Sequence, residues 1–571
     1  MTGRERRIAA IGVAALFLAS VGLFLVSRGK WSDAIIDSGR EWIVPDALAR
    51  GDLLYRDVVY WFGPFTPYFH AAFFRIFGSS FSTLVLAGIV GSLGVLAALY
   101  FALRRVTGKS EAALWTGLAI PVLVFMPNAG GSILGMGYRI WHAAAFSLAA
   151  IAVAARPASN RPAFNAAAAG ALSALSGLCR TEWGLASLIA VATVYARHSR
   201  RTTPTRILIA GSSFLLTFTA VLGAFILAAG WKSVVVDGHV LLTGLPPETR
   251  RFLVTMSGVR DWRAGLAQLV YSSAMWFGAF LLVDLFASMG DRPRLRRRLP
   301  WLASLFVVIG ASALFGGASG AVVFSAAPLV CLAATIAGLS RRLRPKGAAL
   351  VAFGLLGVLL SYRRPFHIGD GAYVGPPLLF AFVSSAGLLR LALARVRPDG
   401  HRHRLRTGLS LAMGSLLVVA FAGRALGYVF DRRVPVAGTA GMISARPEVA
   451  REIGEIAAEI RGRSPSDGLV VFPEGEVLNF LSGRRNPLRH KLYIRGYLTE
   501  ENEGEVLEGL REARPAAIVI GRRRTSEYGA SRFGSDYAVR IGAWIAGNYA
   551  PFSPDGGVRG RMSAFDYYFR R

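Results

Sequence analysis

The chain has 571 residues, of which 53% are hydrophobic and only 17% are charged, and its mean hydropathy is +0.44. A soluble protein carries about 25% charged residues, so the composition excludes a soluble enzyme. Repeated uncharged runs of about twenty apolar residues exclude a single-pass receptor, and also an outer-membrane barrel, whose strands alternate apolar and polar residues. The net charge of +31 lies mainly in residues 1–430, which hold 43 Lys/Arg against 16 Asp/Glu. Basic loops of this kind orient membrane helices, so nucleic acid is not expected as a partner.

Thirteen apolar runs predict membrane-spanning helices. The first, residues 8–26, is longer than the apolar region of a signal peptide, and no small-residue cleavage site follows it, so we expect an uncleaved helix with a cytoplasmic N-terminus. The loops after the even-numbered runs are basic, as expected of cytoplasmic loops. The other runs are residues 82–103, 111–127, 140–155, 163–179, 183–196, 207–229, 266–289, 301–316, 319–339, 347–362, 376–395 and 408–427. With thirteen spans, residues 428–571 would lie outside the cytoplasm.

The C-terminal part has a different pattern. It predicts, in order, a charged amphipathic helix at 448–461, a buried strand at 469–473, a helix at 503–513, a strand at 516–520 and a closing helix at 537–549. Strands that alternate with helices indicate a small α/β domain, and neither strand is followed by a glycine-rich nucleotide-binding turn. The expected fold class is therefore a polytopic α-helical membrane domain with about 13 spans, residues 1–430, followed by a small extracytoplasmic α/β domain, residues 431–571.

The first predicted outer loop, residues 27–81, is long and rich in acids. If it is helical, Asp33, Asp37 and Glu41 stand at i, i+4 and i+8 and share one face. A carboxylate at a membrane edge can take a proton from a hydroxyl or amine, or can help to bind a divalent ion. The alternative is a solvated helix whose acids face water.

Several motifs follow the first apolar run in a definite order. They are Asp37, a segment with Ala47 and Ala49, the Gly-x-x-x-Tyr-x-Asp turn of residues 51–57, and the proline-aromatic segment 63–68. This order resembles the GT-C superfamily of membrane glycosyltransferases, and most closely the branch of the protein O-mannosyltransferases and lipid A aminoarabinose transferases. The resemblance covers about residues 1–200. The family often shows two adjacent acids where this chain has Asp37 and then Glu41, so the division of roles between these two acids stays open.

The resemblance implies that a sugar leaves a polyprenyl-phosphate carrier and joins an acceptor on the outer face of a bacterial inner membrane. It assigns the general base to Asp37, with Glu41 and Asp57 as further catalytic candidates. The expected partners are the lipid-linked sugar, an extracytoplasmic glycan, lipid or protein acceptor, and the bilayer. This branch is generally metal-independent, so no cofactor is expected, although Asp37 and Asp57 together could share a divalent cation.

The donor phosphate requires cations on the outer side of the membrane. Arg180 lies in the tight turn between the fifth and sixth runs, and an arginine can fork onto a phosphate. Pairing with Glu182 or contact with lipid headgroups is the alternative, and Arg139 is a rival. The candidate substrate-binding residues are Arg40, Tyr55, Arg56, Arg180, Glu182, Arg363, Arg364, His367 and Asp370.

The other histidines and the cysteines receive simpler interpretations. His142 lies among aromatic residues at a helix start and is expected in an interfacial aromatic belt, and His70 is isolated. Cys179 and Cys331 fit neither a metal-ligand nor a disulfide pattern.

Two other functions stay open at this level. A transporter or flippase of a lipid-linked saccharide would carry charges at mid-depth of the bundle or interrupted helices in matching halves, and neither is evident. A non-catalytic scaffold whose C-terminal part binds a partner predicts that removal of Asp37 has no enzymatic effect.

Overall fold

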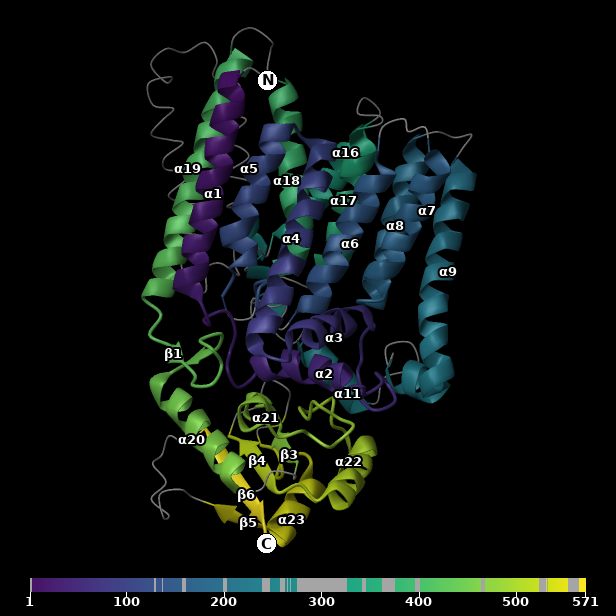
Figure 1. Ribbon diagram of the computed structural model, residues 1–571. Coiled ribbons are helices and arrows are strands. Elements are labelled where there is room, and N and C mark those ends of the chain that lie inside the picture. Colours follow the sequence, from purple (N-terminus) through teal and green to yellow (C-terminus); the bar gives the residue numbers. More distant parts are fainter. Residues whose placement is uncertain are drawn as a thin grey trace.

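The computed structural model describes residues 3–571 apart from the segments 128–129, 136, 157–160, 199–202, 239–246, 257–261, 264, 268, 275–325, 341–345, 362–374, 396–400, 464–467, 523–529, 531 and 553–563. Long helices form a bundle at one end of the molecule, an α/β unit (residues 434–570) lies at the other end, and the short helices of the first loop lie between them (Figure 1). The N-terminus and the C-terminus are at opposite ends.

The long helices agree with the predicted apolar runs. They are α1 (Gly3–Ser27), α4 (Phe81–Val106), α5 (Lys109–Ala119), α6 (Tyr138–Ala154), α7 (Pro162–Gly177), α8 (Thr181–His198), α9 (Thr203–Ala229), α16 (Ala327–Gly338), α17 (Lys346–Ser361), α18 (Gly375–Arg395) and α19 (His401–Val429). Two predicted runs, 266–289 and 301–316, lie largely or wholly outside the described residues, so the total of thirteen spans stays a prediction.

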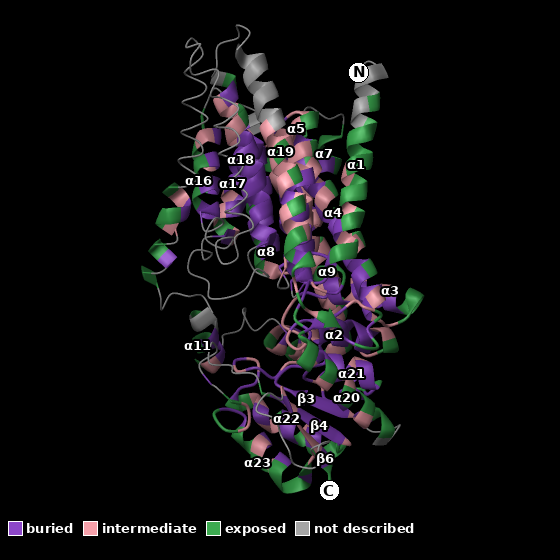
Figure 2. Ribbon diagram, turned by 90° about the vertical axis from the view of Figure 1, so that its left-hand side faces the viewer, coloured by how far each residue is buried: buried purple, intermediate pink, exposed green. Residues whose placement is uncertain are grey.

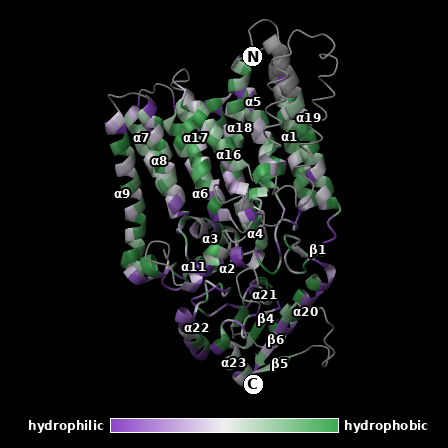
Figure 3. Ribbon diagram, turned by 180° about the vertical axis from the view of Figure 1, so that it is seen from behind, coloured by the Kyte–Doolittle hydropathy of each residue, from purple (hydrophilic) through white to green (hydrophobic). Residues whose placement is uncertain are grey.

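Five of the described helices are long and apolar enough to cross a membrane, namely Ala10–Ser27, Phe81–Val106, Thr203–Ala229, Gly375–Ala394 and Ala412–Val429. The spans in α1, α9 and α19 leave most of their residues unburied, whereas α18 is mostly buried within the bundle (Figure 2). The bundle is also strongly apolar in composition (Figure 3). Exposed apolar surface of this extent is unfavourable in water and suits contact with lipid. The chain is therefore a multi-pass membrane protein.

One predicted run is not a continuous α-helix. The run 111–127 corresponds to α5, which ends at Ala119 and continues as a π-helical turn, η1 (Ile120–Val124). Pro121 lies in this turn and has no backbone N–H to donate. The loss of that hydrogen bond gives a physical reason for the change in winding.

The first loop forms two short helices, α2 (Ser38–Arg50) and α3 (Phe65–Phe77). Asp37 occupies the N-cap position of α2, and Gly51 ends the helix with a φ of +112°, which favours glycine. The predicted stripe of three acids on one helix is therefore wrong for Asp33. Its carboxylate instead accepts the N–H groups of Ile35 and Ile36, each at 2.8 Å, which bends the chain before α2 begins.

The α/β unit contains a four-stranded sheet in the order β3–β4–β6–β5. The parallel pair β3–β4 agrees with the two predicted strands, whereas β6 pairs antiparallel with both β4 and β5. The strands are β1 (Val434–Pro435), β2 (Ser444–Ala445), β3 (Leu469–Phe472), β4 (Ala517–Gly521), β5 (Tyr549–Phe552) and β6 (Phe565–Arg570), and the helices are α20 (Pro447–Arg463), α21 (Val477–Ser482), α22 (Glu500–Ala513) and α23 (Val539–Asn548). The prediction missed β5 and β6, because β6 pairs with β4, which is distant in the sequence, and β5 pairs with β6.

The α/β unit packs directly on the first loop. Gly39 of α2 lies against the backbone of Glu476 and Val477, where a Cβ would overlap them. Phe480 of α21 packs on Trp42 and Phe81, with ring centroids 5.2 and 4.6 Å away. One hydrophobic cluster thus continues from the first loop into the α/β unit, and the two parts hold each other in place.

Candidate functional site

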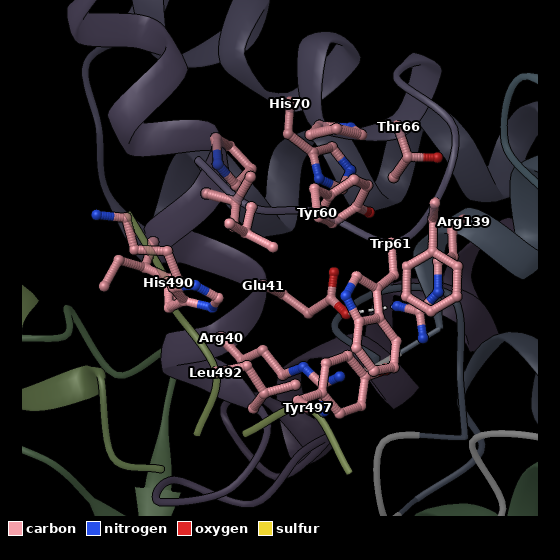
Figure 4. A pocket seen from close by; sticks show the side chains of 17 residues that line it. Arg40, Glu41, Tyr60, Trp61, Thr66, His70, Arg139, His490, Leu492 and Tyr497 are labelled. Atoms are coloured by element: carbon pink, nitrogen blue, oxygen red, sulfur yellow. Dashed lines mark ion pairs between the residues drawn. The ribbon is translucent and has the colours of Figure 1, made fainter. Parts of the chain in front are cut away.

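A pocket of about 730 Å³, including its open mouth, lies where the first loop meets the α/β unit (Figure 4). Its walls come from α2, the loop before α3, α3 itself, the start of α6 and the segment 490–497. Its polar and aromatic lining residues are Arg40, Glu41, Tyr60, Trp61, Phe62, Thr66, His70, Arg139, His490, Lys491 and Tyr497. The site therefore requires both ends of the sequence.

Three charged side chains of the pocket lie close together. The carboxylate of Glu41 is 3.6 Å from a guanidinium nitrogen of Arg139, and both side chains are largely buried. Burial raises the pKa of Glu41, while Arg139 and then Arg40 oppose this rise. Glu41 lies in the first turn of α2, where the helix dipole favours a carboxylate. Arg40 and Arg139 thus bring two guanidinium groups to this part of the pocket, where they act on Glu41, and Arg40 also acts on Asp37 and Glu476.

The two guanidinium groups are positioned by aromatic rings. The Arg139 Cζ lies 3.9 Å from the centroid of the Phe62 ring, and the Arg40 Cζ lies 5.6 Å from that of Tyr497. Tyr497 also stacks on Trp61, with centroids 3.8 Å apart and an interplanar angle of 12°. Cation–π contacts of this kind orient an arginine without neutralising its charge.

Asp37 lies one helical turn before Glu41, beside the pocket but outside its lining. It is 7% exposed and its side chain caps none of the α2 amides. Burial raises the pKa of Asp37 to about 8, assisted by the charges of Asp33 and Glu474 and opposed by Arg40. Within the described residues Asp37 forms no ion pair. A carboxyl group with this pKa exchanges its proton near neutral pH, as a general base must.

Two acids of the α/β unit lie near Asp37, and the sequence analysis did not single them out. Glu474 and Glu476 follow β3, and they are 2% and 0% exposed. Burial raises the pKa of Glu476 to about 8, and the charge of Glu474 adds to this effect. The signal that could have identified them is the sequence Phe-Pro-Glu-Gly-Glu directly after a buried strand, because acids are seldom buried without a specific role.

The segment 490–497 was also not identified from the sequence. Its residues His490, Lys491, Leu492 and Tyr497 line the pocket. The ammonium group of Lys491 donates to the backbone oxygens of Asn486, at 2.9 Å, and of Leu488, and burial lowers the pKa of Lys491 to about 8. Lys491 therefore stabilises its own loop as well as lining the site.

The turn formed by Tyr55, Arg56 and Asp57 supports the site but does not line it. Asp57 accepts the N–H of Leu53 at 2.8 Å and is held by a two-pronged hydrogen bond from Arg56 at 2.9 and 2.8 Å. The hydroxyl of Tyr55 donates to the backbone oxygen of Phe62 at 2.7 Å. The Tyr55 hydrogen bond thus reaches the backbone of Phe62, whose ring lies against Arg139, whereas the contacts of Asp57 with Leu53 and Arg56 hold the turn itself.

Arg180 adopts the alternative considered for it, an ion pair with Glu182 at 2.5 Å. It is outside the pocket lining, although its Cζ lies 5.2 Å from the Phe62 ring. Arg139 of α6 and Arg180, which directly precedes α8, thus stand against the same aromatic ring. Arg363, Arg364, His367 and Asp370 lie outside the described residues.

His142 is not part of an exposed aromatic belt, so that expectation is wrong. It is 7% exposed, and its Nδ1 is 3.0 Å from the hydroxyl of Thr66 in α3. His70 lies close by, with its ring 5.8 Å from that of His142. His142 is buried because α3 folds back under the bundle and covers the start of α6, where His142 lies.

Among the described residues, no group of three or more His, Cys, Asp or Glu side chains is arranged to hold a metal ion. Asp37 occupies the buried N-cap position of α2, whereas Asp57 lies in a partly exposed turn. Cys179 and Cys331 are buried, and neither forms a disulfide.

The architecture is similar to that of solved GT-C glycosyltransferases. The structure of ArnT from Cupriavidus metallidurans in the apo state matches with a TM-score of 0.55 and 12% sequence identity over 98% of both chains. The oligosaccharyltransferase of Archaeoglobus fulgidus, tethered to an acceptor peptide with an NVT sequon, matches with a TM-score of 0.51 and 13% identity over 98% of this chain and 74% of that one. No protein-family model matches the sequence, and the comparison with curated proteins found no match. The resemblance seen in residues 1–200 is thus confirmed as a shared fold, and it extends over nearly the whole chain.

Proposed function

We propose that this protein is an integral-membrane glycosyltransferase that moves a sugar from a polyprenyl-phosphate carrier to an acceptor on the extracytoplasmic face. The observation that carries the proposal is one pocket with Glu41, Arg40 and Arg139 in its wall and Asp37 beside it, in a chain with the GT-C fold. The N-terminus and the α/β unit lie at opposite ends of the bundle. This arrangement supports their placement on opposite sides of the membrane.

The proposed reaction is a displacement at the anomeric carbon of the donor sugar. The acceptor oxygen or nitrogen forms the new bond to this carbon, and its proton passes to the carboxylate of Asp37. The bond between the carbon and the phosphate oxygen breaks, and the polyprenyl phosphate leaves with the electron pair. A positioned base contributes about 10²–10⁴ to the rate of such a step.

Asp37 is a better base than Glu41 because of their different surroundings. Glu41 faces Arg139 at 3.6 Å, and this charge favours its ionised form and weakens it as a proton acceptor. Asp37 lies next to other acids, which strengthen its affinity for a proton. The proposed role of Glu41 is to hold Arg139 in the pocket.

The two guanidinium groups of the pocket account for the leaving group. Arg139 and Arg40 are directed into the pocket by Phe62 and Tyr497, and a guanidinium group can fork onto phosphate oxygens. Arg180 lies near the same Phe62 ring, but its pairing with Glu182 compensates its charge. The lipid tail of the donor would then extend along the apolar bundle, and the segment 490–497 would form the acceptor side of the pocket.

The test uses the full chain purified in lipid nanodiscs, with radiolabelled polyprenyl-phosphate sugars supplied one at a time and membrane extract as the acceptor. Wild type is expected to transfer label, and Asp37→Asn is expected to lose a hundredfold or more in rate. Asp57→Asn keeps an oxygen for the Leu53 amide and serves as the matched control, with a rate within about tenfold of wild type.

Three outcomes would contradict parts of this proposal. Full activity in Asp37→Asn combined with loss in Glu41→Gln would move the base to Glu41. Equal loss in Asp37→Asn and Asp57→Asn would mean that both variants act through the fold. In sealed vesicles, movement of labelled lipid across the bilayer without any transfer would replace the enzyme with a lipid-linked saccharide transporter.

A further inference from the structure

His70, in the wall of the pocket, carries a buried polar atom without a hydrogen-bond partner among the described residues. The residue lies on α3, is 1% exposed and lines the pocket wall. Among the described residues its Nε2 has no hydrogen-bond partner. A buried polar atom without a partner is unfavourable, and in native proteins such an atom calls for a water, a ligand or a functional role.

The surroundings of His70 keep its ring neutral. Burial lowers the pKa of His70 well below its usual range, and His142 adds to this effect. The rings of Tyr138 and His142 lie 4.5 and 5.8 Å from it. Thr66, the nearest hydroxyl on the same helix face, is already bonded to His142. A neutral imidazole nitrogen donates or accepts one hydrogen bond, so His70 can bind a hydroxyl but cannot attract an anion through charge.

The pocket separates charged from uncharged polar groups. Figure 4 shows His70 and Thr66 at one end and Arg40 and Tyr497 at the other, with the carboxylate of Glu41 between them. A phosphate would bind at the end with the arginines. The part of a ligand that suits His70 is uncharged and able to form a hydrogen bond, and the hydroxyl groups of a sugar ring meet both conditions.

We propose that the His70 end of the pocket is a sugar subsite, in which Nε2 of His70 forms a hydrogen bond with one hydroxyl of a saccharide. The proposal rests on the proposed glycosyltransferase function and adds a residue that recognises the sugar. Two sources share this chemistry, the sugar of the donor and a saccharide acceptor, and the experiment separates them.

The experiment compares His70→Gln with His70→Asn in full-length protein in nanodiscs. A glutamine amide can place a polar atom near the position of Nε2, whereas an asparagine amide reaches only the position of Nδ1. The probes are undecaprenyl phosphate alone and undecaprenyl phosphate that carries the sugar transferred most rapidly by wild type. If the donor sugar binds His70, His70→Asn should bind the sugar-bearing probe about three- to tenfold more weakly than His70→Gln does, as expected for one neutral hydrogen bond. Both variants should bind undecaprenyl phosphate as wild type does.

The other outcomes are equally specific. If the acceptor sugar is the one bound, donor affinities stay equal and the KM for the acceptor rises by the same factor in His70→Asn. The loss in His70→Asn relative to wild type should be the same at pH 6 and pH 9, because the wild-type ring carries no charge at either pH. Equal donor affinity and equal acceptor KM in the two variants, with unchanged unfolding temperatures, would overturn the subsite and leave water as the partner of Nε2.

A measurement on wild type covers the case in which a variant does not fold. With ¹⁵N-labelled histidine, the Nε2 resonance of His70 should shift when the sugar-bearing ligand is added and not with undecaprenyl phosphate alone. No shift with either a sugar-bearing donor or an acceptor would overturn the proposal. Failure of wild type to bind or consume any donor would instead show that the proposed function is wrong, and the subsite with it.

Discussion

Replacement of Glu474 by glutamine should raise the rate of the proposed transfer reaction in mildly acidic solution. The charge of Glu474 helps to raise the pKa of Asp37 to about 8, after burial and Asp33. With that pKa, about 1% of Asp37 is ionised at pH 6. Glutamine removes the like charge and keeps the shape of the side chain. If this lowers the pKa by about one pH unit, the ionised fraction at pH 6, and with it kcat/KM, rises about tenfold, equivalent to about 1.4 kcal/mol.

The assay is the pH dependence of kcat/KM between pH 5 and 9, whose acidic limb reports the base of the unliganded enzyme. Arg40 acts on Asp37 with the opposite sign, so Arg40→Gln should move the same limb to higher pH even if substrate binding also weakens. Glu500→Gln, on an exposed part of α22, is the matched control and should leave the limb in place. An unchanged limb in Glu474→Gln, or one displaced to higher pH, would refute the assignment of this charge to Asp37.

Three further results are expected. Gly39→Ala should lower the thermal unfolding temperature, because its Cβ would overlap the backbone of Val477 and overpacking costs about 1–3 kcal/mol; an unchanged temperature would argue against the close contact. Arg139→Ala should weaken the binding of undecaprenyl phosphate by about tenfold or more, as expected for a lost hydrogen bond to a charged group, and equal affinity would remove Arg139 from the phosphate site. In a double-mutant cycle of unfolding free energies, Trp61→Ala and Tyr497→Ala should be coupled by about 0.5–1.5 kcal/mol, whereas additive effects would mean that their stacking does not join the two parts of the chain.

The membrane architecture could be predicted from the sequence because it depends on local composition. A helix that crosses lipid must satisfy its backbone hydrogen bonds internally and present apolar side chains along its length, and both requirements are visible in a run such as 82–103. The strands β3 and β4 were equally visible as short apolar segments. The later strand β6 was not, since its aromatic residues become a strand only by pairing with β4.

The sequence by itself also identified the acids of the first loop, but their different roles depend on contacts. Asp57 and Asp37 are chemically identical, yet Asp57 accepts an amide and an arginine in a turn, whereas Asp37 is buried near Asp33 and Glu474. Glu474 is far from Asp37 in the chain. Burial and charge interactions are sums over spatial neighbours, and those neighbours are brought together only when the α/β unit packs on the first loop. The tertiary structure therefore decided which acid has a raised pKa, and the sequence determined that acids would be present in the first loop.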